Sequence, residues 1–201
     1  MTRMVGMWRV LASIGCVLAG TAFAEAPPPA RGQPALVEEV VAVVRGPGAP
    51  KARIVTLTRL EEEARIALVS RGAIGAAVAP LDRAALRAAL VWLVDQTLLG
   101  DEAARLQVFE VEQADLDAEV QRFRERFARP ADYRAFLDRF ELSEEELARV
   151  LRRTLRVQRY VESRAGAGEP AAVERKVRSM VEDLRRRSEV RILDDLTEAK
   201  R

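Results

Sequence analysis

The sequence contains no histidine, and its single cysteine, Cys16, lies in an apolar stretch near the N-terminus. Imidazole and thiolate groups supply many of the general bases, nucleophiles and transition-metal ligands of enzymes. Their absence from the rest of the chain excludes histidine- or cysteine-dependent catalysis and a disulfide framework. We therefore expect a protein that is not an enzyme, has no cofactor or metal site, and acts through its surface.

The first 24 residues have the organisation of a cleavable secretory signal peptide. A basic start, an apolar stretch and the small-x-small site Ala22-Phe23-Ala24 follow one another. The apolar stretch is shorter than the roughly 20 residues that a membrane-spanning helix needs. We expect cleavage after Ala24 and a periplasmic protein. An uncleaved anchor, or lipidation of Cys16, is the alternative.

Basic and acidic side chains nearly balance, at 33 and 31. Cleavage after Ala24 would remove Arg3 and Arg9 and leave a protein without net charge. Such a protein lacks the basic surface that binds phosphate backbones. We expect no nucleic-acid partner and no stable insertion into a membrane after cleavage.

Short apolar runs at both ends of the chain predict a small sheet. The runs 40–44 and 53–56 flank the turn-forming residues 45–50 and predict a hairpin. A third strand is expected at 190–193, and it needs a partner because an isolated hairpin is only marginally stable. Ile192 is therefore expected to pair with the N-terminal hairpin, near 41–43 or 54–55.

The spacing of apolar residues predicts helices for most of the remaining chain, and thus a mainly α fold. Thr58 and Ser143 each begin a capping-box pattern, Asp82 caps the second helix, and Gly100 is expected to interrupt it. The expected helices are 59–70, 83–99 with a continuation at 102–106, 113–127, 131–140, 144–162 and 171–187. The last helix carries an apolar stripe that the fold should cover: Val173, Val177, Met180, Val181 and Leu184.

The order and spacing of six segments can be compared with those of known protein families: 41–46, 54–61, 90–106, 111–117, 136–147 and 184–192. In order and spacing they resemble the chaperone module of SurA-like periplasmic proteins and related parvulin-type foldases. The resemblance covers most of residues 38–193. It implies a helical chaperone domain, preceded by a flexible linker at 25–37 and followed by a disordered tail at 194–201.

The chain departs from this family at its isomerase domain. Only the linker 163–170 stands where family members insert that domain, and residues 171–193 would then close the module. Family isomerase sites use histidine, which this sequence lacks. The resemblance therefore implies an ATP-independent chaperone for unfolded or unassembled exported and outer-membrane proteins, without prolyl isomerase activity. A dedicated adaptor or assembly subunit of one cell-envelope complex is the alternative, and a homodimer is left open.

A chaperone needs apolar side chains that remain accessible to its clients. Six aromatic residues of the middle helices are candidates for client binding, although the sequence does not say which of them point inward. They are Phe109, Phe123, Phe127, Tyr133, Phe136 and Phe140.

Two charged clusters allow both a functional and a structural interpretation. Asp115, Asp117 and Glu119 could bind a metal ion, or they could be the solvated start of a helix. Four arginines share a helix face that could bind anionic lipids or acidic clients, or could be laced with salt bridges. These arginines are Arg149, Arg152, Arg156 and Arg159.

Overall fold

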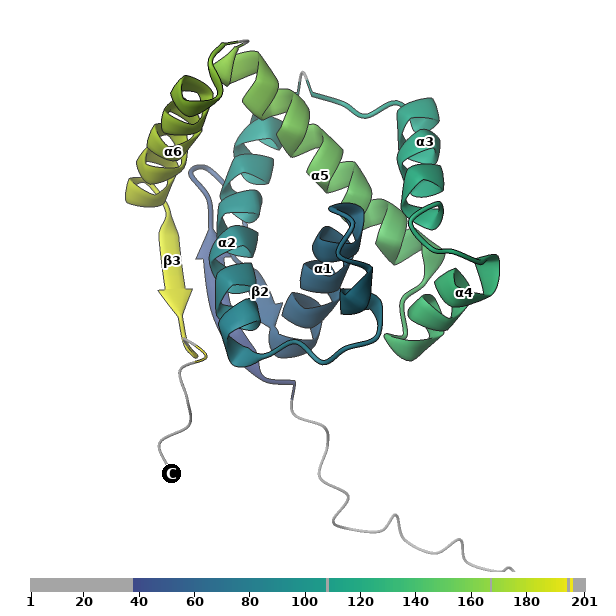
Figure 1. Ribbon diagram of the computed structural model, residues 1–201. Helices are drawn as coiled ribbons and strands as arrows, with labels where there is room; N and C mark the ends of the chain where they lie inside the picture. Colours follow the sequence, from purple (N-terminus) through teal and green to yellow (C-terminus); the bar gives the residue numbers. More distant parts are fainter. Residues whose placement is uncertain (1–37, 108, 167, 195, 197–201) are drawn as a thin grey trace, which may run out of the picture. The chain divides into compact units, whose positions relative to one another are not determined.

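Both ends of the folded chain contribute strands to one sheet. The computed structural model describes residues 38–107, 109–166, 168–194 and 196, so the predicted signal peptide and linker lie outside it. The three strands are β1 (Val40–Arg45), β2 (Arg53–Thr56) and β3 (Glu189–Ile192). They form an antiparallel sheet in the order β2-β1-β3, visible in Figure 1. Ala42 pairs with Ile192, which confirms the expected pairing of the two chain ends.

The sheet buries one face and exposes the other. Ala42 and Val44 are fully buried; Ala42 pairs with Val55 of β2, and Val44 pairs with Val190 of β3. The opposite face carries Ile54, whose side chain is 56 % exposed. One covered face and one exposed face are typical of an antiparallel sheet, although the alternation in β1 is broken at an irregularity between Val40 and Ala42, where Val41 is fully buried as well.

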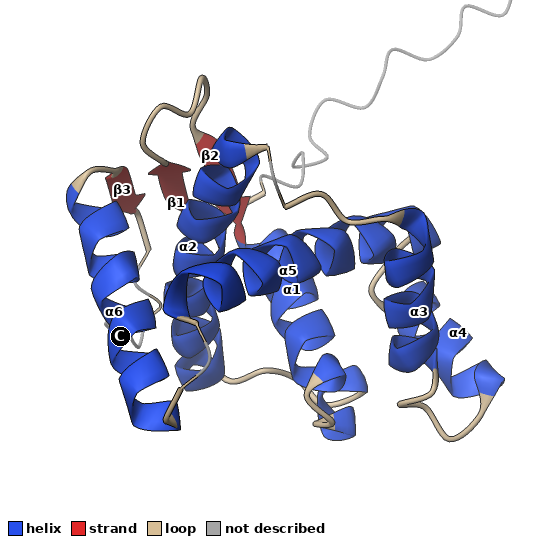
Figure 2. Ribbon diagram, turned by 90° about the horizontal axis from the view of Figure 1, so that it is seen from above, coloured by secondary structure: helices blue, strands red, loops and turns tan. Residues whose placement is uncertain are grey.

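Helices make up most of the described residues, which confirms the mainly α fold. Their bounds are α1 (Leu57–Ser70), the 3₁₀ helix η1 (Ile74–Ala77), α2 (Arg83–Leu106), α3 (Gln113–Arg124), α4 (Pro130–Arg139), α5 (Glu144–Ala165) and α6 (Pro170–Arg186). In Figure 2, α1 and α2 lie next to the strands, whereas α3 and α4 lie at the far end of the fold from the sheet.

Buried apolar side chains form two clusters that share α1 and α5. The first cluster joins the sheet to α2, α6 and the C-terminal half of α5, where it includes Val157 and Tyr160. The second joins α3, α4 and η1 to the N-terminal half of α5, where it includes Leu147 and Leu151. The two long helices therefore hold both halves of the fold together.

A charged pair lies between the two clusters. Glu63 of α1 is only 3 % exposed, and it accepts hydrogen bonds from Arg153 of α5 and, at 3.0 Å, from Arg59 Nε. Along α1, Glu63 stands between Leu60 of the first cluster and Ile66 of the second. Burial lowers the pKa of Arg153, and the charge of Glu63 opposes this shift. Arg153 therefore depends on Glu63, because without this carboxylate its guanidinium would be buried unpaired.

Two local predictions about helix ends were wrong. The cap of α1 is Thr56, whose hydroxyl accepts from the Arg59 N–H at 3.3 Å, so the helix begins before Thr58. Gly100 does not interrupt α2, which runs unbroken to Leu106. By contrast, Asp82 caps α2 and Ser143 forms the expected capping box with Glu146.

The C-terminal segment packs onto the first cluster through α6 and beyond β3. Leu184 is the buried residue of the α6 stripe, while Val173, Val177, Met180 and Val181 are only partly covered. Leu196 is also buried, and its carbonyl accepts from Arg87 at 3.0 Å. The ordered core thus extends past the expected boundary at residue 193.

Candidate functional site

The structure brings five of the six candidate aromatic residues together, mostly inside the second cluster. Phe123, Phe127, Tyr133 and Phe136 are buried there, with ring centroids 5.5 Å apart for Phe127 and Phe136. Phe140 is partly buried at the edge of the group, 5.4 Å from Phe136. Rings in such tilted and edge-on contacts stabilise one another. Most of this aromatic surface is therefore packed against itself.

Phe109 lies apart from the other five. It precedes α3 and packs against the first cluster, where its ring meets Tyr160 edge-on at 5.5 Å. The sequence groups Phe109 with the middle helices, but the fold uses it to cover the C-terminal half of α5. The six candidates are therefore not one continuous surface.

A short apolar loop is fixed beside the aromatic cluster by two arginines. Arg65 of α1 is buried, and its guanidinium donates to the carbonyl oxygens of Ala76 and Ala79 at 2.7 Å each. The same guanidinium lies 4.2 Å from the ring centroid of Phe140, a cation–π distance. Arg139 of α4 donates to Val78 O at 3.2 Å. The bonds from Arg65 hold η1 and the residues after it against α1, and the bond from Arg139 holds Val78 against α4.

The space between this loop and α4 is an apolar groove of about 420 Å³. Its residues are Ile74, Gly75, Ala77 and Val78 from the loop, and Phe127, Ala128, Asp132, Ala135, Phe136 and Arg139 from the other side. The side chain of Val78 is 64 % exposed and that of Ile74 is 37 % exposed. The groove thus combines accessible aliphatic side chains with an aromatic floor. We call it the η1–α4 groove.

Charged side chains flank the η1–α4 groove. Asp132 is paired with Arg129 at 2.8 Å, and this hydrogen bond lowers the pKa of Asp132. Arg139 stands on the same helix and is bound to the loop carbonyl. An apolar floor with a charged margin favours contact with apolar segments that also carry polar groups.

Sequence reasoning missed Ile74 and Val78, although a signal was present. The segment 73–79 is apolar yet lies between the loop markers Gly72 and Pro80. Apolar residues in a loop have no helical or strand period that would assign them to the core. Exposure of such side chains in a fixed loop is a feature of binding surfaces.

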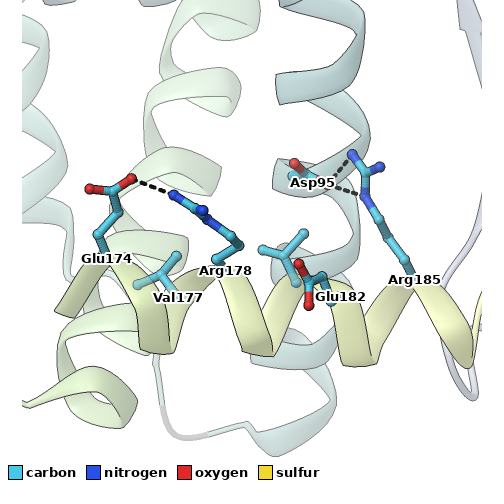
Figure 3. A pocket seen from close by; sticks show the side chains of 7 residues that line it. Asp95, Glu174, Val177, Arg178, Glu182 and Arg185 are labelled. Atoms are coloured by element: carbon cyan, nitrogen blue, oxygen red, sulfur yellow. Dashed lines mark hydrogen bonds and ion pairs between the residues drawn. The ribbon is translucent and has the colours of Figure 1, made fainter. Parts of the chain in front are cut away.

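A second hollow lies between α6 and α2, shown in Figure 3. Val177 and Val181 of α6 line it, together with charged side chains of the same helix. Arg185 crosses to α2, where its Nε lies 2.7 Å from Asp95 Oδ1. Burial raises the pKa of Asp95, and the bond to Arg185 opposes this effect. This hollow is smaller and more charged than the η1–α4 groove, so it supports client binding less well.

The two charged clusters of the sequence meet each other across α3 and α5. Arg159 donates to Asp115 and to the Glu110 carbonyl, and Arg152 donates to Gln113. The other two acids of the first cluster are held within α3, since Asp117 accepts from Gln113 and Glu119 pairs with Arg122. These contacts give Asp115, Arg152 and Arg159 a structural role at the junction of the two helices. Throughout the described ranges, no group of three or more acidic side chains is placed to hold a metal ion.

In the part of the chain that the structure describes, no helix has the length and apolar character to cross a membrane. No family model matches the sequence, and neither the curated proteins nor the solved structures include a significant match.

Proposed function

We propose that this protein is an ATP-independent, periplasmic chaperone-like protein that binds unfolded or unassembled exported proteins through the η1–α4 groove. The observation that carries the proposal is the exposure of Ile74 and Val78 in a loop that Arg65 and Arg139 fix over an aromatic floor. Apolar side chains that are exposed singly are normal, but an exposed apolar patch around a groove marks a binding site. The resemblance to SurA-like modules and the predicted signal peptide support the same role.

The groove suits reversible binding of a client. Its apolar side chains offer contact area without a deep, closed cavity, and a hydrophobic site of this kind discriminates little between clients. Each short contact is weak because association and ordering of a flexible segment cost free energy. A client can therefore leave again without an energy source.

The proposal is tested by aggregation of unrelated unfolded proteins in the presence of the purified protein. We expect suppression of light scattering for several clients, and a clear loss of this effect in Val78→Asp, which places a charge in the groove. The matched control is Val91→Asp, because Val91 is a valine of α2 that is 46 % exposed and does not line the groove. Its activity should equal that of the unsubstituted protein.

Two outcomes would contradict the proposal. Equal activity of Val78→Asp and the unsubstituted protein would remove the groove from the function. Failure to protect any of the unrelated clients, together with copurification of one envelope protein, would favour a dedicated adaptor instead.

A further inference from the structure

The free edge of β2 forms one wall of a further groove, distinct from the η1–α4 groove and from the hollow between α6 and α2. The strand order places β2 at the edge of the sheet, opposite β3. Leu57 N–H donates to Glu39 O on the β1 side. Because alternate residues of a strand turn their backbone groups to opposite sides, the N–H groups of Ile54 and Thr56 point away from β1. An edge of this kind is a template for pairing with another extended chain.

The groove that runs along this edge has a volume of about 530 Å³. We call it the β2-edge groove. Ile54 and Thr56 line it on the side of the sheet, and Ile66, Leu142 and Val150 supply apolar surface. Ile66 and Leu142 belong to the second hydrophobic cluster, so this surface is continuous with the core.

Among the charged side chains of the β2-edge groove, one carboxylate takes part in no hydrogen bond or ion pair with another described residue. The groove contains four acids (Glu38, Glu62, Glu63 and Glu146) and three arginines (Arg59, Arg149 and Arg153). Glu63 is held by Arg59 and Arg153, Glu38 accepts from Thr56 at 2.6 Å, and Glu146 accepts from Ser143 in the capping box. Among the described residues, no hydrogen bond or ion pair engages Glu62.

The surroundings of Glu62 penalise its negative charge. Its pKa is raised to about 7, first by burial and then by the charges of Glu146, Glu63 and Glu38, which outweigh that of Arg59. A cation placed in the groove would remove this penalty, since an opposite charge nearby favours the ionised form. With four acids against three arginines, the groove is complementary to a single positive charge.

We propose that the β2-edge groove binds an extended peptide segment that carries a lysine or arginine. The segment pairs with the outward backbone groups of β2 as an added strand, and its basic side chain meets Glu62. Strand addition supplies affinity through main-chain hydrogen bonds, while pockets for side chains supply the preference for sequence. This site is separate from the η1–α4 groove, and it names a class of segment that the proposed function leaves open.

The test uses two fluorescein-labelled nonapeptides of alternating valine and threonine that differ only at the centre, which is lysine in one and glutamine in the other. Binding to the purified protein is measured by fluorescence anisotropy at pH 8 and low salt. We expect the lysine peptide to bind about fivefold more tightly, the size of a partly exposed ion pair. Glu62→Gln should abolish this preference.

Glu145→Gln is the matched control, because it removes the same charge from the neighbouring α5 turn outside the groove. It should retain the preference for lysine. Peptides with N-methyl groups on one or the other alternate set of backbone amides test the added strand. One set should abolish binding and the other should leave it unchanged.

Three results would overturn the inference: no measurable binding of the lysine peptide, equal affinity for both peptides, or an undiminished preference in Glu62→Gln. A preference that survives in Glu62→Gln would place the peptide elsewhere, for instance on the edge of β3. Val78→Asp should leave peptide binding unchanged, so failure of the η1–α4 groove as a client site and failure of this inference are distinguishable.

Discussion

Glu63 and Arg153 place a full charge pair between two hydrophobic clusters. Such a pair gains little over well-packed apolar residues, but removing one partner leaves the other charge buried and uncompensated. The arrangement makes the packing of α1 against α5 specific, since each helix must present its charge at one position along its length. It also makes the junction sensitive to single substitutions.

Glu63→Gln should lower the free energy of unfolding by about 3 kcal/mol, because Arg153 loses its counter-charge in a buried site. Urea unfolding followed by circular dichroism measures this change. Glu182→Gln, at an exposed position of α6, is the control and should stay within about 0.5 kcal/mol of the unsubstituted protein. Equal stability of both variants would mean that water or rearrangement compensates Arg153.

The pKa of Glu62 predicts a dependence of stability on pH. It is about 7 in the folded protein against an ordinary value of 4.5, so the folded state binds more protons between these two values. Stability therefore falls as pH rises from about 4.5 to 7. Thermal unfolding should give similar Tm values for Glu62→Gln and the unsubstituted protein at pH 4.5, and a higher Tm for Glu62→Gln at pH 8. A Tm difference that does not change with pH would contradict the raised pKa.

At the scale of residues, the sequence identified a group of aromatic side chains but not which of them are buried. The aromatic residues of the middle helices were recognised as one group, yet only the fold shows that Phe123 and Phe136 are core while Phe140 lies at an edge. Ile74 and Val78 could not be assigned, since exposure of a loop residue depends on what packs beside it. Arg65, which fixes that loop, gave no local signal.

At the scale of elements, the helices were predictable because their apolar residues recur at helical spacing. Their ends were less predictable. Thr56 and Thr58 are both suitable N-cap residues. Which of them caps α1 depends on where β2 ends, and β2 ends at Thr56. Gly100 lowers helix propensity, yet α2 is continuous through it. Gly100 packs against α5, where a Cβ at this position would lie 3.6 Å from the side chains of Arg153 and Val157. We infer that this packing outweighs the low propensity of glycine.

The cap of α1 can be tested with two threonines of the same segment. Thr56→Ala should destabilise the protein by about 1 kcal/mol, because the Arg59 N–H loses its acceptor. Thr58→Ala, at an exposed position inside the helix, should leave stability unchanged or slightly raised. Chemical denaturation measures the free energy of unfolding of both variants. A larger loss of this free energy in Thr58→Ala than in Thr56→Ala would support the capping box at Thr58 that the sequence predicted.

At the scale of the whole molecule, the meeting of the chain ends was predictable from an unpaired strand at each end. Its details were not. The expected pairing of Ile192 near 41–43 or 54–55 did not single out Ala42 as its partner, and no pattern predicted the burial of Leu196 beyond β3. These depend on contacts between residues far apart in the chain, which no local pattern encodes.

Truncation after Pro170 should disrupt the fold, since it removes α6 and β3 and exposes β1 as a new sheet edge. We expect a much lower Tm, or no cooperative transition, and a tendency to aggregate. Leu184→Ala tests the same packing in the intact chain, with an expected loss of about 2–4 kcal/mol. A truncated protein with an unchanged Tm would make the C-terminal segment an appendage.

The pairing of Ala42 with Ile192 has a mechanical consequence. Because β1 and β3 are antiparallel, the beginning of β1 and the end of β3 lie at the same end of their ladder. Tension applied through residues 38 and 194 would separate the two strands from that end, breaking one hydrogen bond after another like a zipper. Strands pulled from opposite ends would instead share the load over all their bonds. This protein should thus open under weak pulling force even where it withstands denaturant.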